Sequence, residues 1–178
     1  MRSEDTAYLE NRLYYELVPP MLQGKAPRVF VGDASWNRIK PFVYERAGHR
    51  CEICGRRSSK LHAHERYGIL GDVLVLKRIL AVCPLCHLSI HPGLAQAKGQ
   101  GAKAFARYAR INKVPIWLAK QDCMNAMSRW RKQTNITQID WSMLADVQYR
   151  VFLSAEMVSK ALSSYREGKI IIPLAYIP

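Results

Sequence analysis

The sequence predicts an α+β fold that is mostly helical, and three observations support this class. Apolar residues recur at three- and four-residue spacing along much of the chain after residue 100, which is typical of helices. Two Cys-x-x-Cys pairs enclose a segment of 28 residues, which has room for a β-hairpin. The 178 residues, 49% hydrophobic and 23% charged, suffice for a buried core and exclude a wholly disordered chain.

Helix-breaking residues divide the N-terminal part of the chain. Residues 6–17 are expected to form a short helix that ends before Pro19-Pro20. After Pro27, residues 29–31 (Val-Phe-Val) indicate an extended arm. We therefore assign residues 1–34 to an N-terminal helix and arm.

The next segment, residues 35–100, is expected to form the core of the domain. Ser35 can cap a helix that runs to Ala47, and Gly48 can end it. Pro41 lies inside this helix and is expected to kink or shorten it. The two cysteine pairs and four of the five histidines follow in the same segment.

Three helices are predicted after residue 100. The first begins at Gly101, and the second opens at Pro115 and runs to Lys132; we assign residues 101–141 to this basic helical extension. Residues 142–178 are assigned to a long helix, residues 142–167, and a tail. The apolar residues of that helix alternate in steps of three and four, the spacing of a dimer seam, so it either mediates a homodimer or packs on its own domain.

The charge is strongly basic and uneven. Lysine and arginine number 27 against 14 acidic residues, a net charge of +13 that favours a polyanionic partner, with nucleic acid the commonest. Residues 98–132 hold nine basic residues and one acid, Asp122, so a solvated helix face is the alternative to phosphate contact. The candidate nucleic-acid-binding residues are Lys103, Arg107, Arg110, Lys113, Lys120, Arg129, Arg131 and Lys132.

The two cysteine pairs have the spacing of zinc knuckles. Cys51 and Cys54 form one pair and Cys83 and Cys86 the other, and four thiolates would close a tetrahedral, structural zinc site. The alternatives are a redox-active pair or four buried cysteines without a metal. Cys123 stands apart from both pairs.

Four histidines cluster around the second cysteine pair. His87 and His91 are four residues apart, so on a helix both rings lie on one face, and His62 and His64 share a face on a strand. Surface histidines, core histidines and additional zinc ligands are the alternatives. A second metal site built from imidazole and carboxylate, with open positions, suits hydrolysis of a phosphodiester.

A family resemblance follows from the order of these residues. They are Cys51, Cys54, His64, Glu65, Cys83, Cys86, His87 and His91. The pattern resembles the HNH endonuclease superfamily of bacterial or phage type, and roughly residues 30–145 take part. The resemblance implies a treble-clef zinc site and a ββα-metal (His-Me finger) core, with flanking helices. It further implies a structural Zn²⁺, a catalytic Mg²⁺, Mn²⁺ or other divalent ion at His64, His87 and His91, and cleavage of nucleic acid, DNA rather than RNA.

The resemblance leaves two registers for the catalytic pair. In one, His64 binds the metal ion and Glu65 is the general base; in the other, His64 is the base and Ala63 leaves the ligand position empty. The first is chemically coherent and is preferred. Arg78 stands near the place of the HNH asparagine, and Pro92 is expected to end or kink the helix that carries His91.

Two functions therefore compete at the level of sequence. The first is an HNH-type endonuclease, and the second is a zinc-binding module that holds nucleic acid without cutting it. The N-terminal residues contain no apolar stretch like that of a signal peptide, and no apolar run approaches the roughly 20 residues of a membrane span. We expect a cytoplasmic protein without a membrane partner.

Overall fold

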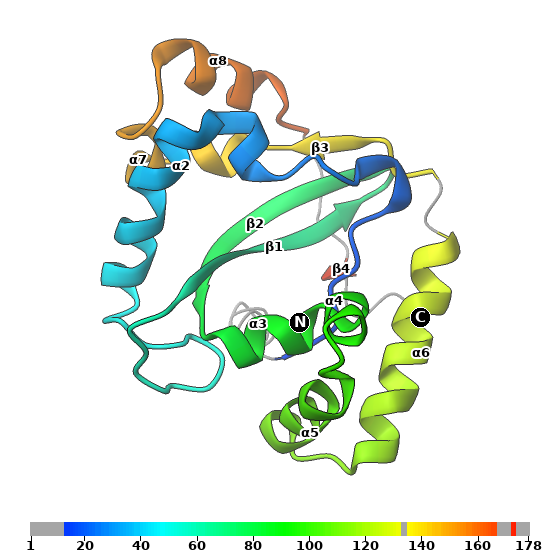
Figure 1. The fold of residues 1–178 in the computed structure, drawn as a ribbon. Helices are drawn as coiled ribbons and strands as arrows, with labels where there is room; N and C mark the ends of the chain where they lie inside the picture. Colours follow the sequence, from blue (N-terminus) through cyan, green and yellow to red (C-terminus); the bar gives the residue numbers. More distant parts are fainter. Residues whose placement is uncertain (1–12, 133–134, 167–171, 174–178) are drawn as a thin grey trace.

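A computed structural model of the chain describes residues 13–132, 135–166 and 172–173 (Figure 1). The architecture is α+β, as predicted. The elements in chain order are η1 (Pro20–Leu22), α2 (Pro27–Arg46), β1 (His62–Leu70), β2 (Val73–Val82), α3 (Pro84–Ile90), α4 (Pro92–Ala97), α5 (Gly101–Asn112), α6 (Ile116–Lys132), β3 (Gln138–Asp140), η2 (Ser142–Ala145), α7 (Val147–Arg150), α8 (Ala155–Ser163) and β4 (Ile172–Pro173).

The expected β-hairpin forms between the two cysteine pairs. β1 and β2 are antiparallel, with His64 opposite Leu80, and Gly71 takes the positive φ of 58° that the turn requires. β3 adds to β2 in parallel and β4 adds to β1 antiparallel, so the sheet order is β3-β2-β1-β4. Figure 1 shows this hairpin between two groups of helices, with α2, α7 and α8 on one side and α3, α4 and α5 on the other.

The N-terminal predictions are wrong where the structure tests them. Residues 29–31 are helical rather than extended, because α2 begins at Pro27, where a proline fits the first helical turn, and Val31 is fully buried in the core. The break in α2 occurs at Gly32, with φ of 74°, whereas the helix continues through Pro41. The predicted helix over residues 6–17 lies partly outside the described residues, and residues 13–19 are not helical.

The long C-terminal helix predicted for residues 142–167 is also wrong. The described residues form η2, α7 and α8 instead, because two polar side chains each begin a new helix. The Asp146 carboxylate accepts a hydrogen bond from the Gln148 backbone N–H, and the Ser154 hydroxyl accepts one from Met157. The apolar side chains that were expected to share one helix face therefore have different environments: Leu144 is fully buried, whereas Leu162 is 57% exposed.

These two leucines provide a matched test of the C-terminal architecture. Leu144→Ala is expected to lower the free energy of unfolding by about 2–5 kcal/mol, because it leaves a cavity in the core. Leu162→Ala is expected to change it by no more than about 0.5 kcal/mol, because this side chain is largely solvated. Urea denaturation followed by circular dichroism measures both. Equal losses of unfolding free energy at the two positions would contradict the division of this segment into η2, α7 and α8.

Two large hydrophobic cores, and a small cluster of Leu88, Ala95 and Ala104, stabilise the described part of the molecule. The larger joins the hairpin with α2 and the segment of η2, α7 and α8. The smaller joins residues 13–17 with α3, α5 and α6, and in it the rings of Tyr15 and Tyr108 stack with centroids 4.3 Å apart. No helix in the described part of the chain combines the length and apolar character needed to cross a bilayer.

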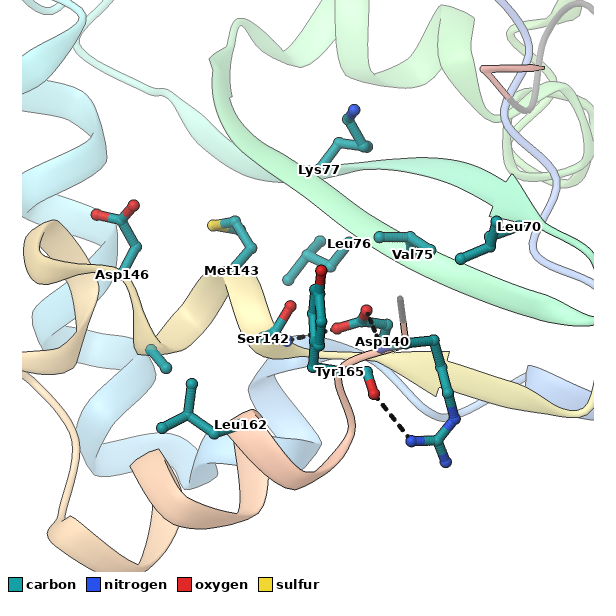
Figure 2. Close-up of a pocket in the computed structure, with 12 residues that line it drawn as sticks. Leu70, Val75, Leu76, Lys77, Asp140, Ser142, Met143, Asp146, Leu162 and Tyr165 are labelled. Carbon is teal, nitrogen blue, oxygen red and sulfur yellow. Dashed lines mark hydrogen bonds between the residues drawn. The ribbon is translucent and has the colours of Figure 1, made fainter. Parts of the chain in front are cut away.

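An open pocket of about 560 Å³ lies between β2, β3, η2 and the segment around α8 (Figure 2). The buried Asp140 carboxylate at this pocket accepts hydrogen bonds from the backbone N–H groups of Ser142, at 2.8 Å, and Arg166, at 3.1 Å. It thereby ties β3 to η2 and to the end of α8. The lining includes no cysteine and no histidine, so this pocket is distinct from the candidate metal centres.

Candidate metal centres

The first cysteine pair is held by a tight turn against the end of β2. Gly55 has φ of 69°, and its N–H donates to the Cys51 carbonyl at 2.8 Å, which folds the chain back after Cys54. Glu52 then fixes this turn to the hairpin, since its N–H donates to the Ala81 carbonyl and its carboxylate accepts from the Ala81 N–H. Hydrogen bonds made by Gly55 and Glu52 thus fix the turn that carries Cys51 and Cys54 against the end of β2.

The second cysteine pair completes the cluster at the start of α3. Cys83 follows β2 directly and Cys86 lies in the first turn of α3. The sulfur atoms of all four cysteines lie within 4.8 Å of one another, and those of Cys54 and Cys83 are 3.9 Å apart. Sulfurs around a tetrahedral zinc with Zn–S bonds of about 2.3 Å are about 3.8 Å apart, so the spacing fits. The four cysteines are therefore placed to hold a metal ion such as zinc.

Arg107 contacts this cluster instead of facing solvent. Its side chain is 7% exposed, and its guanidinium donates two hydrogen bonds of 3.3 Å to the Cys86 sulfur. The prediction that Arg107 contributes to a nucleic-acid-binding face is contradicted, because α5 packs on α3 and brings this residue to the thiols. A cation there offsets the negative charge that four thiolates accumulate around a divalent ion.

We expect Arg107→Ala to weaken metal retention by the cysteines. The variant removes both hydrogen bonds to Cys86, each a charge-assisted bond when the sulfur is a thiolate. The rate of zinc release to a chromogenic chelator should rise about tenfold or more, as is usual when the outer partner of a metal ligand is lost. Lys103→Ala, at an exposed position of the same helix, is the control, and equal release rates from both variants would count against the role of Arg107.

Three histidines form a second cluster beside the cysteines. His64 comes from β1, His87 from α3 and His91 from the residue after α3. One ring nitrogen from each lies within 4.8 Å of the others, and the ring centroids are 4.9–5.3 Å apart. α3 ends at Ile90, as expected from Pro92, yet the non-helical backbone of His91 keeps its ring in the cluster.

The environment keeps these imidazoles neutral. Burial strongly lowers the pKa of His64, and the charge of Arg66 lowers it further. Burial, followed by the neighbouring histidines, lowers the pKa of His87 to about 3. Burial lowers the pKa of His91 to about 4, although the charge of Glu16 and a hydrogen bond with its backbone oppose this. Neutral imidazoles are the form that binds metal ions.

One further observation indicates that the three-histidine cluster can bind a cation. The Nδ1 atom of His64 is buried and has no hydrogen-bond partner among the described residues. A Glu65 carboxylate oxygen lies 4.0 Å from this nitrogen. An unpaired buried nitrogen costs free energy unless something binds it, and a divalent ion at this point satisfies it. His64, His87 and His91 are the candidate ligands.

Glu65 has the properties of a proton acceptor. Its side chain is about one-fifth exposed, and burial together with the charge of Glu16 raises its pKa to about 7. A carboxylate with this pKa exchanges a proton readily near neutral pH. Its location beside His64 Nδ1 agrees with the register in which His64 binds the metal ion and Glu65 is the base.

Two residues of this site lie outside the ligand set predicted from the sequence. The exposed His62, which the sequence places in the histidine cluster on one strand face with His64 but not among the ligands, has its Nδ1 3.1 Å from the Nδ1 of His87. Glu16 is buried, and its carboxylate lies 3.0 Å from the Nε2 of His64. Nothing in the sequence indicates this contact, because 48 positions separate the two residues.

The remaining basic candidates lie mostly on the surface. Arg129 is half-buried. The exposed ones are Lys103, Arg110, Lys113, Lys120, Arg131 and Lys132. They belong to α5, α6 and the turn between them, and α5 packs directly on α3, which carries His87. Exposed basic residues therefore lie on the helix that packs against α3, which contributes Cys86 and His87 to the two candidate metal centres.

Comparison of the chain with protein-family models, with curated proteins and with solved structures finds no match. What the chain does must therefore be argued from the geometry of its own residues.

Proposed function

We propose that the protein is a metal-dependent endonuclease of the HNH type, which hydrolyses phosphodiester bonds in nucleic acid, with DNA the favoured substrate. The observation that carries the proposal is the convergence of His64, His87 and His91 on one point beside Glu65. The order of elements supports it, because a β-hairpin followed by a helix supplies His64, Glu65 and His87, and His91 directly follows that helix.

The three imidazoles are proposed to bind a divalent cation. Such an ion supplies electrostatic stabilisation of the charge that develops on the phosphate and on the leaving oxygen. Nitrogen ligands suit a transition ion such as Mn²⁺ better than Mg²⁺, which prefers oxygen ligands and water. Among the residues of the chain, Glu65 is proposed to take a proton from the attacking water, because its carboxylate lies 4.0 Å from the Nδ1 of His64.

The cysteine cluster is proposed to hold a structural zinc ion in a treble-clef arrangement. Four cysteine sulfurs fill a tetrahedral coordination sphere and leave no position for substrate. The cluster joins the turn after α2 to the start of α3, so it fixes the helix that carries His87 relative to the hairpin that carries His64. Its role would be to keep the histidine site in register.

The exposed lysines and arginines of α5 and α6 are proposed to contact the phosphate backbone. They lie in residues 98–132, which hold nine of the 27 basic residues and a single acid, on the two helices that follow the short helix after the histidine site. Contacts of this kind depend on salt and not on base sequence. They favour binding of nucleic acid in general and position it against the site.

A non-catalytic nucleic-acid-binding module is the second candidate. Two observations favour it: His64 is only 1% exposed, and Arg78, which stands near the place of the HNH asparagine, differs from it in charge and binds the Glu52 carboxylate. In that case the cysteine cluster would brace a polyanion-binding surface, and the histidines would hold a second structural ion.

Cleavage assays separate the two candidates. We expect purified protein to nick or cut supercoiled plasmid in Mn²⁺ or another transition ion and to do nothing in EDTA. Linear duplex, single-stranded DNA and RNA, tested in parallel, establish the substrate class. Tight binding without cleavage under every ion would favour the binding module and remove the nuclease.

A further inference from the structure

Residues 13–18 form a non-helical segment that is fixed to α5 and α6 by hydrogen bonds. The Leu13 carbonyl accepts a hydrogen bond of 2.6 Å from the Asn112 side chain, and the Val18 carbonyl accepts one of 2.7 Å from Trp130. The Tyr15 hydroxyl donates to the Ala119 carbonyl. The segment therefore has a defined place between α5, α6 and the hairpin, and it brings one carboxylate, that of Glu16, to the histidine site.

The Glu16 carboxylate is buried and accepts hydrogen bonds at both oxygens. The Tyr67 backbone N–H donates to Oε1 at 2.8 Å, and the Arg66 guanidinium donates to Oε2 at 3.1 Å. Neither donor can accept a hydrogen bond, so both oxygens act as acceptors; burial raises the pKa of Glu16, whereas Arg66 and the Tyr67 N–H lower it and favour the carboxylate. The Nε2 of His64 lies 3.0 Å from Oε2. A carboxylate oxygen only accepts, so a ring proton on the Nε2 of His64 completes this contact.

This arrangement determines which nitrogen of His64 is left to bind a metal ion. With the proton on Nε2, the Nδ1 atom carries a lone pair, and it is the buried nitrogen without a hydrogen-bond partner among the described residues. Metal-binding histidines commonly donate their other ring N–H to a carboxylate, which fixes the ring and makes it a better ligand. Glu16 also contacts His91, through a backbone hydrogen bond. One residue thus touches two of the three candidate ligands.

We infer that Glu16 is a positioning residue of the histidine site, which holds His64 in the tautomer and orientation that present Nδ1 to a divalent cation. The inference rests on the proposed metal site and adds to it a residue outside the β-hairpin and helix. It makes residues 13–18 part of the metal centre. A chain that lacks this segment would keep the ligands but lose the group that orients one of them.

The first test is the tautomer of His64 in the wild-type protein with the cysteine site loaded with zinc. Long-range ¹H–¹⁵N NMR spectra distinguish a protonated Nε2 from a protonated Nδ1, and His64→Gln identifies the resonances. We expect the proton on Nε2. A proton on Nδ1 would overturn the inference, and this measurement does not depend on whether any Glu16 variant folds.

The second test is Glu16→Gln. The amide keeps the size of the side chain but presents an N–H group that favours an acceptor at Nε2, which moves the ring proton to Nδ1 and blocks that nitrogen. Affinity for Mn²⁺ or Co²⁺, measured by calorimetry on the zinc-loaded chain, should fall about 10–100-fold. The cysteine site should keep its zinc.

Asp140→Asn is the matched control. Asp140 is also buried and accepts hydrogen bonds at both oxygens, from the backbone N–H groups of Ser142 at 2.8 Å and Arg166 at 3.1 Å, but it contacts no histidine among the described residues and belongs to neither candidate metal centre. If Glu16→Gln and Asp140→Asn lower the affinity equally, the effect is general destabilisation and the inference fails. If Glu16→Gln changes neither the affinity for the ion nor the tautomer of His64, the inference fails although the proposed metal site remains. If the wild-type protein, like His87→Ala, binds no ion beyond the one in the cysteine site, the proposed function and the inference fail together.

Discussion

His87→Ala is expected to lower the rate of metal-dependent cleavage at least about 100-fold, because it removes a ligand outright, and loss of even an outer partner of a ligand costs 10–100-fold. The ring contacts both other candidate ligands, with centroids 5.3 Å from His64 and 4.9 Å from His91. Removing the His87 ring leaves the candidate metal site with one ligand fewer and keeps all four cysteines. Single-turnover cleavage of a labelled duplex measures the rate.

The control for this variant is His49→Asn. His49 is exposed, lies outside both clusters, and has a backbone φ of 54°, a conformation that asparagine tolerates well. We expect its cleavage rate to equal that of the wild type. Full activity in His87→Ala with intact zinc content would contradict the catalytic assignment and leave the binding module.

Loss of one cysteine of the cluster is expected to have the largest effect on stability. Cys86→Ala removes a fully buried sulfur that lies next to the other three and accepts both hydrogen bonds from Arg107. We expect zinc content to fall from one ion per chain to none and the free energy of unfolding to fall by about 4 kcal/mol or more. For a chain of this size that corresponds to a decrease in Tm of about 10 °C.

Cys123→Ala is the control for the cysteine experiment. Cys123 is buried in α6 and belongs to the smaller core, outside the four-cysteine cluster. Its replacement creates only a small cavity, at a cost of about 1 kcal/mol, and should leave the zinc content unchanged. A Cys86→Ala protein that keeps its metal, as measured by plasma mass spectrometry, would show that the four cysteines do not form a zinc site.

Local sequence determines much of both candidate metal centres. The two-residue spacing inside each cysteine pair brings two sulfurs together whatever the rest of the chain does, and the 28 residues between the pairs accommodate a hairpin, as the structure shows. Period-2 spacing places His62 and His64 on one face of a strand. The α+β class follows from equally short-range rules, so these expectations could be made from the sequence. The expected nearness of His87 and His91 is also found, but a non-helical residue after α3 produces it and not the helical spacing.

Tertiary structure decided the features that depend on contacts between distant residues. Val31 lies in a helix because its side chain is buried in the core there, although valine prefers strands. The fate of residues 142–167 depended on Asp146 and Ser154 acting as helix caps, which apolar spacing alone does not reveal. Arg107 has the same charge and helical spacing as its exposed neighbours, and only the packing of α5 on α3 turns it toward the thiols.

Glu16 shows most clearly which features the sequence determines and which depend on the tertiary structure. The sequence by itself determined which side chains could bind metal ions, because ligand chemistry and short spacings are local properties. Only the folded chain decided that a carboxylate 48 residues away orients His64, since that contact exists through the joint packing of residues 13–18 on β1, α5 and α6. Local rules carry no information about such a contact, because its free energy depends on burial that the whole fold creates.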